Sequence, residues 1–479
     1  MLTDVGVQFA GRRDVILISG GAMVVAVALG LGAVVSPPVA IAGAGAALFA
    51  TIAFRSLTAG LAIFMVLTFF DRTTVLTQSG LSPVRLAGLV IALIWAIYAF
   101  NRLADTPMLI REYPAFGLGT IVLTGWSFAS ALWASDGALA ITTSGRLALS
   151  AVLVFIVFSA VREPRHVHWL VWAFVAGVFF AQMIGFLHLE PAQGGRLQGG
   201  FDDPNQLASV DVAGMVIAAF AFVAARGRSI RWIFFLCAGL FCVALVRTES
   251  QAGIVALGVA LVLGVAFAGR ARRLAAISVT AFLLLGTFYY TFITKPVLLT
   301  TITSTQNVGA RESVWKVAEQ AAKDHPLLGV GAGNFIRVSP SYTLDNLNLP
   351  RADIILSGHV VHNTYLEVLT ELGPLGLLLL LGLIAGNFTL GVRAVRRFER
   401  AGEWELEMLT RGILIGTAAI LTTSIFATAT YEKQLWVLLA LGPSLAGLAA
   451  RVPVSPAVMV EPPRRRTRLQ GPGEAWNRR

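Results

Sequence analysis

The segment His362-Asn-Thr-Tyr-Leu-Glu-Val-Leu-Thr-Glu371-Leu-Gly-Pro-Leu-Gly-Leu-Leu-Leu-Leu-Leu-Gly-Leu-Ile-Ala-Gly386 indicates the fold class. From Leu372 on, the chain carries no charge as far as Val392, and this stretch is long enough, as a helix, to cross the hydrocarbon core of a bilayer. The first half of the segment is polar, with Asn363, Glu367 and Glu371 spaced four apart on one helical face. Carboxylates inside a membrane helix usually line a cavity; the alternative is an interfacial rim with Asn363 as a helix cap.

Apolar runs of this kind recur along all 479 residues, of which 56% are hydrophobic and only 13% charged. A soluble chain of this length needs more charge to cover its surface. We therefore predict an all-α polytopic membrane protein with about 12 to 14 transmembrane helices. The expected spans are 15–35, 38–54, 57–70, 86–100, 114–133, 146–161, 168–187, 206–225, 232–246, 252–268, 274–293, 364–392, 408–428 and 433–450.

The formal net charge of +11 lies in short clusters between the apolar runs, which is typical of membrane topology rather than of nucleic-acid binding. With the N-terminus in the cytoplasm, about two thirds of the 37 Lys and Arg fall on the inside. This pattern predicts a multi-pass protein of the bacterial inner membrane with both termini cytoplasmic. The expected divisions are N-terminal transmembrane helices 1–189, central helices 190–293, a large periplasmic loop 294–363, C-terminal helices 364–450 and a basic cytoplasmic tail 451–479.

The loop 294–363 is the one long outer connection in this layout, and long loops are usually functional or disordered. Within it, Arg311 to Ala321 has the period of an amphipathic helix, which we expect along the outer membrane interface and which His325-Pro326 ends. The residues expected on its apolar face are Val314, Val317, Ala318 and Ala321. A run of alternating glycines, Gly329 to Asn334, follows; it permits close backbone approach to a ligand, or forms a plain turn.

Three arginines, Arg196, Arg247 and Arg311, lie on the predicted outer side, where arginine is otherwise sparse. One guanidinium group can bind phosphate oxygens through two parallel hydrogen bonds. An imidazole such as that of His362 can take a proton from a hydroxyl near neutral pH. The set suits transfer from a pyrophosphate-linked donor. Arg196 as a loop charge and Arg247 as a snorkelling helix end are the alternatives. Asp202-Asp203 offers two oxygen ligands for a divalent ion, but the same loop has no further acidic cluster.

Four segments in this order resemble the O-antigen ligase and polymerase superfamily of membrane glycosyltransferases. They are Arg196-x-x-Gly-Gly-Phe-x-Asp-Pro-Asn205, Arg247-x-x-Ser250, Gly309-x-Arg311 leading through Trp315 to Pro326-Leu-Leu-Gly-Val-Gly-Ala-Gly-Asn-Phe335, and His362-Asn-x-Tyr-Leu-Glu367 with Glu371-Leu-Gly-x-x-Gly376. The second turn reads Ser250-Gln251-Ala252, where relatives often have Ser-Arg-Gly.

The resemblance implies a C-type glycosyltransferase fold and a metal-independent, inverting transfer that uses no cofactor. The donor would be a polyprenyl-pyrophosphate-linked glycan, the acceptor a glycan, lipid or protein hydroxyl, and the site periplasmic, in contact with the lipid bilayer. The expected catalytic residues are His362, Arg311, Arg247 and Arg196. The expected substrate-binding residues are Asn205, Asn363, Tyr365, Trp315, Gly331, Gly333 and Asn334. A transporter or flippase of the same glycan, or a non-catalytic part of a polysaccharide assembly system, is the alternative function.

Overall fold

The computed structural model describes residues 37–71, 83–101, 108–189, 195–201, 203–273, 305–343 and 358–453, with short pieces at 275–277, 279–280, 283–284, 349 and 355. The predicted span 15–35, most of the predicted span 274–293, Asp202 and the basic tail beyond residue 453 lie outside the described residues. All regular structure in the described part is helical.

The first half of the chain forms a series of apolar helices joined by short connections. They are α2 (Pro37–Arg55), α3 (Leu57–Leu67) with the short η1 (Thr68–Phe70), α5 (Pro83–Asn101), α6 (Leu109–Glu112), α7 (Pro114–Ala129) with η2 (Ser130–Leu132), α8 (Gly137–Ala160) and α9 (Pro164–Phe186).

The second half adds both membrane-length helices and the helices of the long loop. They are α10 (Pro204–Ala224), α11 (Arg228–Thr248), α12 (Gln251–Phe267), η4 (Gly269–Ala271), α15 (Thr305–Asp324), α16 (Phe335–Val338), η5 (Ser339–Thr343), α18 (Thr364–Ala401), α19 (Trp404–Thr423) and α20 (Lys433–Arg451).

Within the described residues, eight helices are long and apolar enough to cross a membrane, and four shorter apolar helices accompany them. The prediction of an all-α polytopic membrane protein is confirmed. Several predicted limits differ from the structure; α18, for example, continues to Ala401, nine residues beyond the predicted limit of 392. Helix α8 begins at Gly137 instead of residue 146, because the Asp136 carboxylate accepts a hydrogen bond from Leu139 N at 2.9 Å and caps the helix. Helix α19 ends at Thr423, five residues before the predicted limit of 428.

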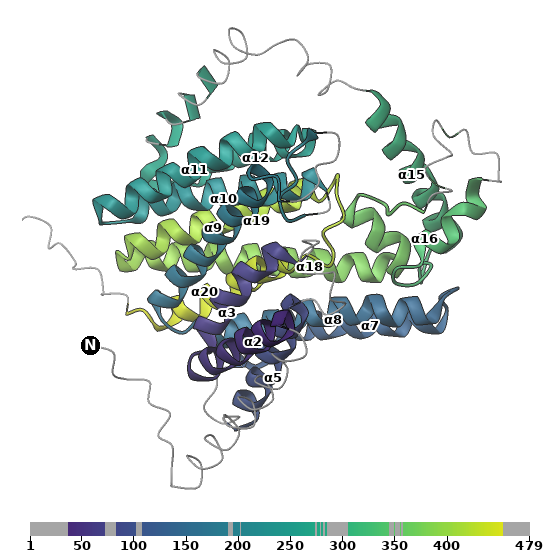
Figure 1. Cartoon of the computed structure of the whole chain (residues 1–479), viewed down its shortest axis with the longest axis horizontal. Coiled ribbons are helices and arrows are strands. Elements are labelled where there is room, and N and C mark those ends of the chain that lie inside the picture. The colour runs from purple at the N-terminus through teal and green to yellow at the C-terminus, as the bar shows by residue number, and fades with distance from the viewer. Residues whose placement is uncertain are drawn as a thin grey trace, which may run out of the picture.

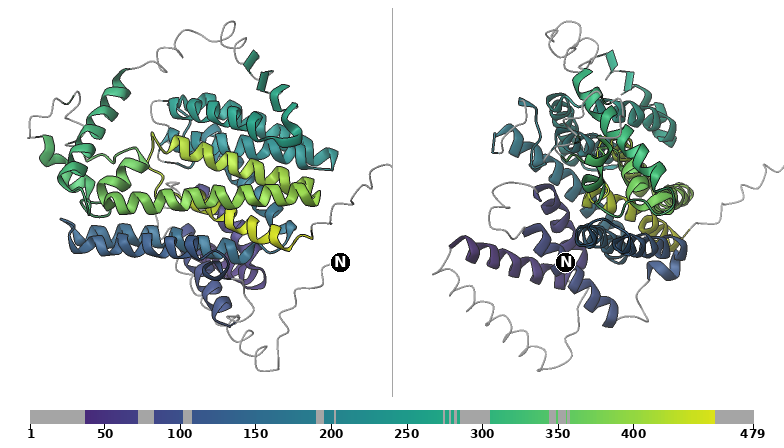
Figure 2. Two further views of the ribbon diagram at one scale, coloured as in Figure 1. Left: turned by 180° about the vertical axis from the view of Figure 1, so that it is seen from behind. Right: turned by 90° about the vertical axis from the view of Figure 1, so that its right-hand side faces the viewer.

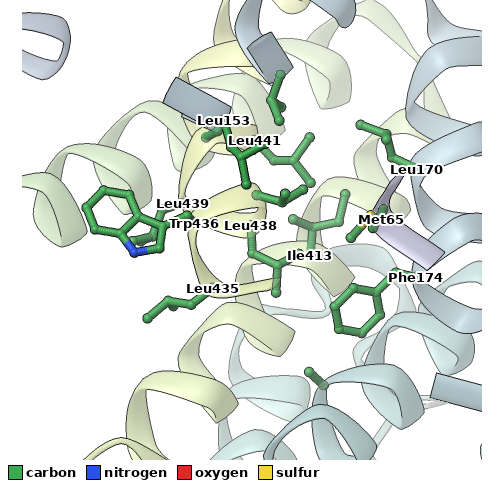
Figure 3. Close-up of a cluster of buried hydrophobic side chains, with 14 of the residues drawn as sticks. Met65, Leu153, Leu170, Phe174, Ile413, Leu435, Trp436, Leu438, Leu439 and Leu441 are labelled. Atoms are coloured by element: carbon green, nitrogen blue, oxygen red, sulfur yellow. The ribbon is translucent and has the colours of Figure 1, made fainter. Parts of the chain in front are cut away.

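Helix α20 lies inside the bundle and organises its core. Figure 3 shows its leucines facing Ile413 of α19, Met65 of α3 and Phe174 of α9. Trp436 is also fully buried here, and its indole nitrogen donates to Thr430 O at 2.8 Å. Other helices therefore shield α20 from lipid, whereas α7 and α11 expose much of their apolar surface.

The two ends of the bundle differ in chemistry. At one end, arginine side chains tie the helices together: Arg411 donates to Phe267 O at 2.5 Å, and Arg397 donates to Ala450 O at 3.0 Å. We call this the arginine-rich end. The opposite end carries α15 and α16, which lie together beyond the ends of α11 and α12 in Figure 1 and in the rear view of Figure 2. We call it the α15 end.

The predicted amphipathic helix is present as α15, and it ends at Asp324, directly before His325-Pro326. Its apolar face packs against α18 and the following loop, forming a small core of its own. All four residues expected on that face are buried: Val314, Val317, Ala318 and Ala321.

Helix α18 is broken at Gly373, whose φ of +68° lies in the left-handed region, and Pro374 follows. Proline has no N–H, so the carbonyl of Thr370, four residues earlier, loses its helical donor. Val330 N donates to that carbonyl at 2.9 Å, and Gly331 N donates to Glu371 O at 2.9 Å. The indole nitrogen of Trp126 on α7 donates to the next carbonyl, Leu372 O, at 2.8 Å. The alternating-glycine turn thus satisfies the carbonyls that the break releases.

We expect Gly373→Ala to destabilise the protein by at least about 2 kcal/mol. A non-glycine residue at this φ is strained, and its Cβ would lie 2.4 Å from Leu327 O. The measurement is unfolding of the purified protein in detergent. Gly382→Ala, in the same helix, is the matched control, because its Cβ would meet nothing within 4 Å. Equal stability of the two variants would contradict the role given to the break.

Candidate functional site

At the α15 end, the loop before α10 docks on the turn between α11 and α12. Leu197 N donates to Arg247 O at 2.9 Å. The Arg196 guanidinium donates through Nε to Thr248 O at 2.9 Å and through Nη2 to Glu249 O at 3.4 Å. These carbonyls belong to the C-terminal end of α11, where helices favour cations. The first two segments singled out in the sequence therefore form one structural unit.

A hydrogen-bond chain joins the starts of α10 and α12. Asp203 caps α10, and its Oδ1 accepts from both the backbone N and the Nδ2 of Asn205, each at 2.8 Å. The Ser250 hydroxyl, which caps α12, donates to Asn205 Oδ1 at 2.7 Å. Asn205 and Ser250 are buried. The amide of Asn205 thus fixes Asp203 relative to the α12 N-terminus.

His362 is held in an unusual backbone conformation directly before α18. Its φ is +52°, which non-glycine residues rarely adopt. The chain on both sides is pinned: Trp315 on α15 donates to Val361 O at 3.1 Å, and Thr364 N donates to Ser424 O at 2.9 Å. Residues that the surrounding structure holds in a strained conformation cluster at functional sites, which fits a functional role for His362, although His188 and Glu249 also have positive φ.

Asp203, Arg311 and His362 interact electrostatically. Burial lowers the pKa of His362; the Asp203 carboxylate opposes this shift, while Arg311 and His359 reinforce it. Burial also lowers the pKa of Arg311, again opposed by Asp203 and reinforced by Arg196. The structure therefore brings Arg196, Arg311 and His362 into one electrostatic group with Asp203. At neutral pH, this group combines two guanidinium charges with an uncharged imidazole.

A cavity of about 540 Å³ opens at Arg311, the member of this group that lines it, between α15, the start of α12 and the loop after α19. Its α15 wall carries two cations and two carboxylates and includes Trp315, and the first turn of α12 contributes the opposite side; the lining residues are Arg311, Glu312, Trp315, Lys316, Glu319, Gln251 and Ala252. Glu312 pairs with Lys316 at 2.8 Å, which leaves Arg311 and the positive end of the α12 dipole to attract an anion. This arrangement suits an anionic ligand such as a phosphate or pyrophosphate.

Of the remaining predicted site residues, Arg247 is exposed, whereas Asn363 and Tyr365 make structural hydrogen bonds. Arg247 is exposed in the last turn of α11. Asn363 caps α18 by accepting from Tyr365 N and Leu366 N, both at 3.1 Å, and the Tyr365 hydroxyl donates to Leu421 O at 2.9 Å.

The glycine turn likewise contacts scaffold elements. Asn334 Oδ1 accepts from Asp136 N at 2.8 Å, and the Ala332 and Gly333 amides donate to Ser130 Oγ and Glu371 Oε2 at 2.9 and 2.6 Å. Added Cβ atoms at Gly331 and Gly333 would meet side-chain atoms at 2.5 and 2.4 Å. We therefore interpret Gly331, Gly333 and Asn334 as residues that hold α18 and α8 together.

The two carboxylates of α18 do not line the cavity beside Arg311. Glu367 Oε2 accepts from Thr430 Oγ1 at 2.7 Å, and Glu371 accepts from the glycine turn; both are buried. Their common face anchors two loops of the α15 end. The sequence analysis expected this face to line a cavity; in the structure its carboxylates bind neighbouring loops instead.

Sequence reasoning weighed Asp203 only as a metal ligand and gave it no role toward His362. The available signal was the order Asp-Pro-Asn, because an Asp before a Pro is a frequent helix start. Among the described residues, there is no group of three or more His, Cys, Asp or Glu side chains placed to hold a metal ion.

Fold and site together define an integral membrane protein with a basic, imidazole-containing site at one end of its helical bundle. Residues 236–381 match the family model described as O-antigen ligase, a range that includes Arg247, Arg311, the glycine turn and His362. The match covers less than half of the chain; it shows that this part is similar to the O-antigen ligase family, and it supports an enzyme of the ligase or polymerase type. No curated protein matches the chain.

We expect Arg196→Ala to lower the free energy of unfolding by about 1 to 3 kcal/mol, because two carbonyls of α11 lose a charged donor. Arg247→Ala, which removes an exposed guanidinium from the same turn, should change it by less than about 0.5 kcal/mol. Chemical denaturation of both variants in detergent measures the difference. Equal losses would show that Arg196 does not hold the turn.

Proposed function

We propose that the protein transfers a glycan from a polyprenyl-pyrophosphate donor to an acceptor hydroxyl, on the periplasmic side of the bacterial inner membrane. The observation that carries the proposal is the grouping of Arg311, Arg196, Asp203 and His362 beside a cavity at the α15 end. The family match, which covers three of the four sequence segments, agrees with it.

The donor pyrophosphate would lie in the cavity lined by Arg311, Lys316 and the first turn of α12. As the anomeric carbon–oxygen bond breaks, its electrons pass to the pyrophosphate oxygens. Arg311 would stabilise that growing negative charge, and Arg196 would add a second positive charge nearby. A partly buried guanidinium interacts more strongly with phosphate than one in water does, because the local dielectric is lower. Arg247 would attract the donor from its exposed position.

His362 would act as the general base. Its lowered pKa leaves the imidazole uncharged near neutral pH and therefore able to accept the hydroxyl proton. The acceptor oxygen then attacks the anomeric carbon on the face opposite the pyrophosphate, which inverts that centre. Asp203 would stabilise the imidazolium that forms, because opposite charges attract. The residues on this path require neither a metal ion nor a nucleotide.

The test of this proposal is transfer in nanodiscs, from a polyprenyl-pyrophosphate oligosaccharide to candidate acceptors in buffer containing EDTA. We expect transfer by the wild type, and a loss on the order of 100- to 1,000-fold in Arg311→Ala. His362→Asn should also lose transfer; asparagine tolerates positive φ, so this variant tests the imidazole without adding backbone strain.

Lys323→Ala is the matched control, because Lys323 is an exposed cation at the far end of the same helix as Arg311. Its transfer rate should equal that of the wild type. Retained activity in His362→Asn would reject the assigned base. Donor binding without transfer to any acceptor would favour a transporter or a component of an assembly system.

The pH dependence of transfer tests the role of Asp203. A base must be unprotonated, so the rate should rise with pH through the pKa of His362 and level off above it. Asp203 opposes the downward shift of the His362 pKa. Asp203→Asn, which preserves the helix cap, should therefore lower the His362 pKa further and move the acid limb to lower pH. An acid limb that stays in place or moves to higher pH would contradict this assignment.

A further inference from the structure

A second cavity, of about 430 Å³, lies at the other end of α15. Its walls come from the α7–α8 connection, the end of α15 and the loop that leads into the glycine turn. Its volume falls within the usual range of small-ligand sites. The polar lining residues are Trp133, Ser135, Asp324 and His325. None of these residues takes part in the proposed transfer chemistry.

The lining combines an aromatic ring with short polar side chains. Trp133 is partly exposed and packs against Trp126, with ring centroids 5.2 Å apart. Trp126 is itself held by its bond to Leu372 O, so this neighbour of Trp133 is fixed in place. The exposed part of the Trp133 side chain lines the cavity and offers an apolar aromatic surface to a ligand.

Asp324, His325 and Ser135 are exposed at the same cavity. A carboxylate and a hydroxyl accept hydrogen bonds from sugar hydroxyls, and an indole ring packs against the apolar C–H face of a sugar. Asp324 Oδ1 already accepts from Gln320 Nε2 at 2.9 Å, which orients the carboxylate. This lining suits a saccharide better than a pyrophosphate, because the described residues that form it include a carboxylate and no lysine or arginine.

The rim of this cavity is apolar and continues onto the outer face of the membrane helices. Leu327 and Leu328 are 77% and 42% exposed, although they belong to a loop. Leu327 O lies against the α18 break, 2.4 Å from where a Gly373 Cβ would be. Directly beyond the break, Leu375 and Leu378 are 42% and 66% exposed on the apolar part of α18. Exposed leucines therefore occur both at the cavity and directly beyond the break, and they offer apolar surface to a lipid chain.

We propose that this cavity binds a saccharide carried on a lipid, with the sugar against Trp133 and Asp324 and the lipid along Leu327 and Leu328. This inference rests on the proposed function, because it identifies the bound molecule as the acceptor of the proposed transfer. Thirteen residues of helix separate Arg311 from Asp324, which is roughly 20 Å. The cavity therefore holds a lipid-proximal sugar, while a distal hydroxyl of the same molecule reaches His362.

The test is binding to the detergent-purified full chain of two probes: lipid A carrying its core oligosaccharide, and the same core oligosaccharide released from its lipid. We expect the wild type to bind the glycolipid about tenfold more tightly than the released oligosaccharide. Trp133→Ala and Asp324→Asn should each weaken glycolipid binding about tenfold, whereas Trp133→Phe, which keeps a ring, should weaken it less. Unfolding curves show whether each variant is folded.

Arg311→Ala and His362→Asn separate this inference from the proposed function. They should bind the glycolipid as the wild type does and fail only in transfer. Absence of transfer by the wild type, with binding sensitive to Trp133, would reject the proposed function and leave the saccharide site standing. Unchanged binding in both Trp133→Ala and Asp324→Asn, or no binding of either probe by the wild type, would overturn the inference.

Discussion

The break in α18 releases backbone carbonyls within a membrane helix, and much of the α15 end is arranged to satisfy them. Inside a membrane protein, an unpaired carbonyl has little water available, so another part of the protein must supply the donor. Val330, Gly331 and Trp126 supply the three donors, to Thr370, Glu371 and Leu372. Left-handed glycines are required here, since the donating backbone has to approach that of α18 closely.

This constraint also positions the candidate chemistry. The glycine turn follows α15 directly, so pairing with α18 fixes the end of α15, and the Trp315 bond to Val361 O fixes its middle. Arg311 and His362 are then held on two elements joined by the same small core. On the other side, the Asp203–Asn205–Ser250 chain ties α10 to α12, next to the cavity wall formed by Gln251. Asp203, Arg311 and His362 lie near one another because backbone and amide hydrogen bonds position the elements that carry them.

Local pattern made the helices predictable, and it drew attention to Arg196, Arg311 and His362; in the structure these form one electrostatic group with Asp203, while Arg247 stays apart. Apolar length indicated the spans, and the spacing of Val314, Val317 and Ala318 indicated the buried face of α15. The role of the glycine turn was not predictable in the same way, because the carbonyls it serves belong to residues some forty positions later. Alternating glycines permit a close approach but do not specify whether the partner is a ligand or another helix. The Asp203 contribution likewise depends on tertiary contacts among three separate elements.

The two cavities lie at opposite ends of α15, and their linings differ in chemistry. A transfer between two substrates needs such a difference, because the donor and the acceptor must be bound separately. The cavity beside Arg311 has that guanidinium and a helix N-terminus, which favour a leaving pyrophosphate, while the Glu312 carboxylate in its wall is paired with Lys316. The cavity beside Asp324 has an indole, a carboxylate and an apolar rim, which favour an uncharged sugar on a lipid. One helix sets the separation of the two cavities. The donor and acceptor lipids would therefore lie at opposite ends of α15, and their reacting groups would come together at His362. Such a division lets the donor and acceptor be selected by different residues.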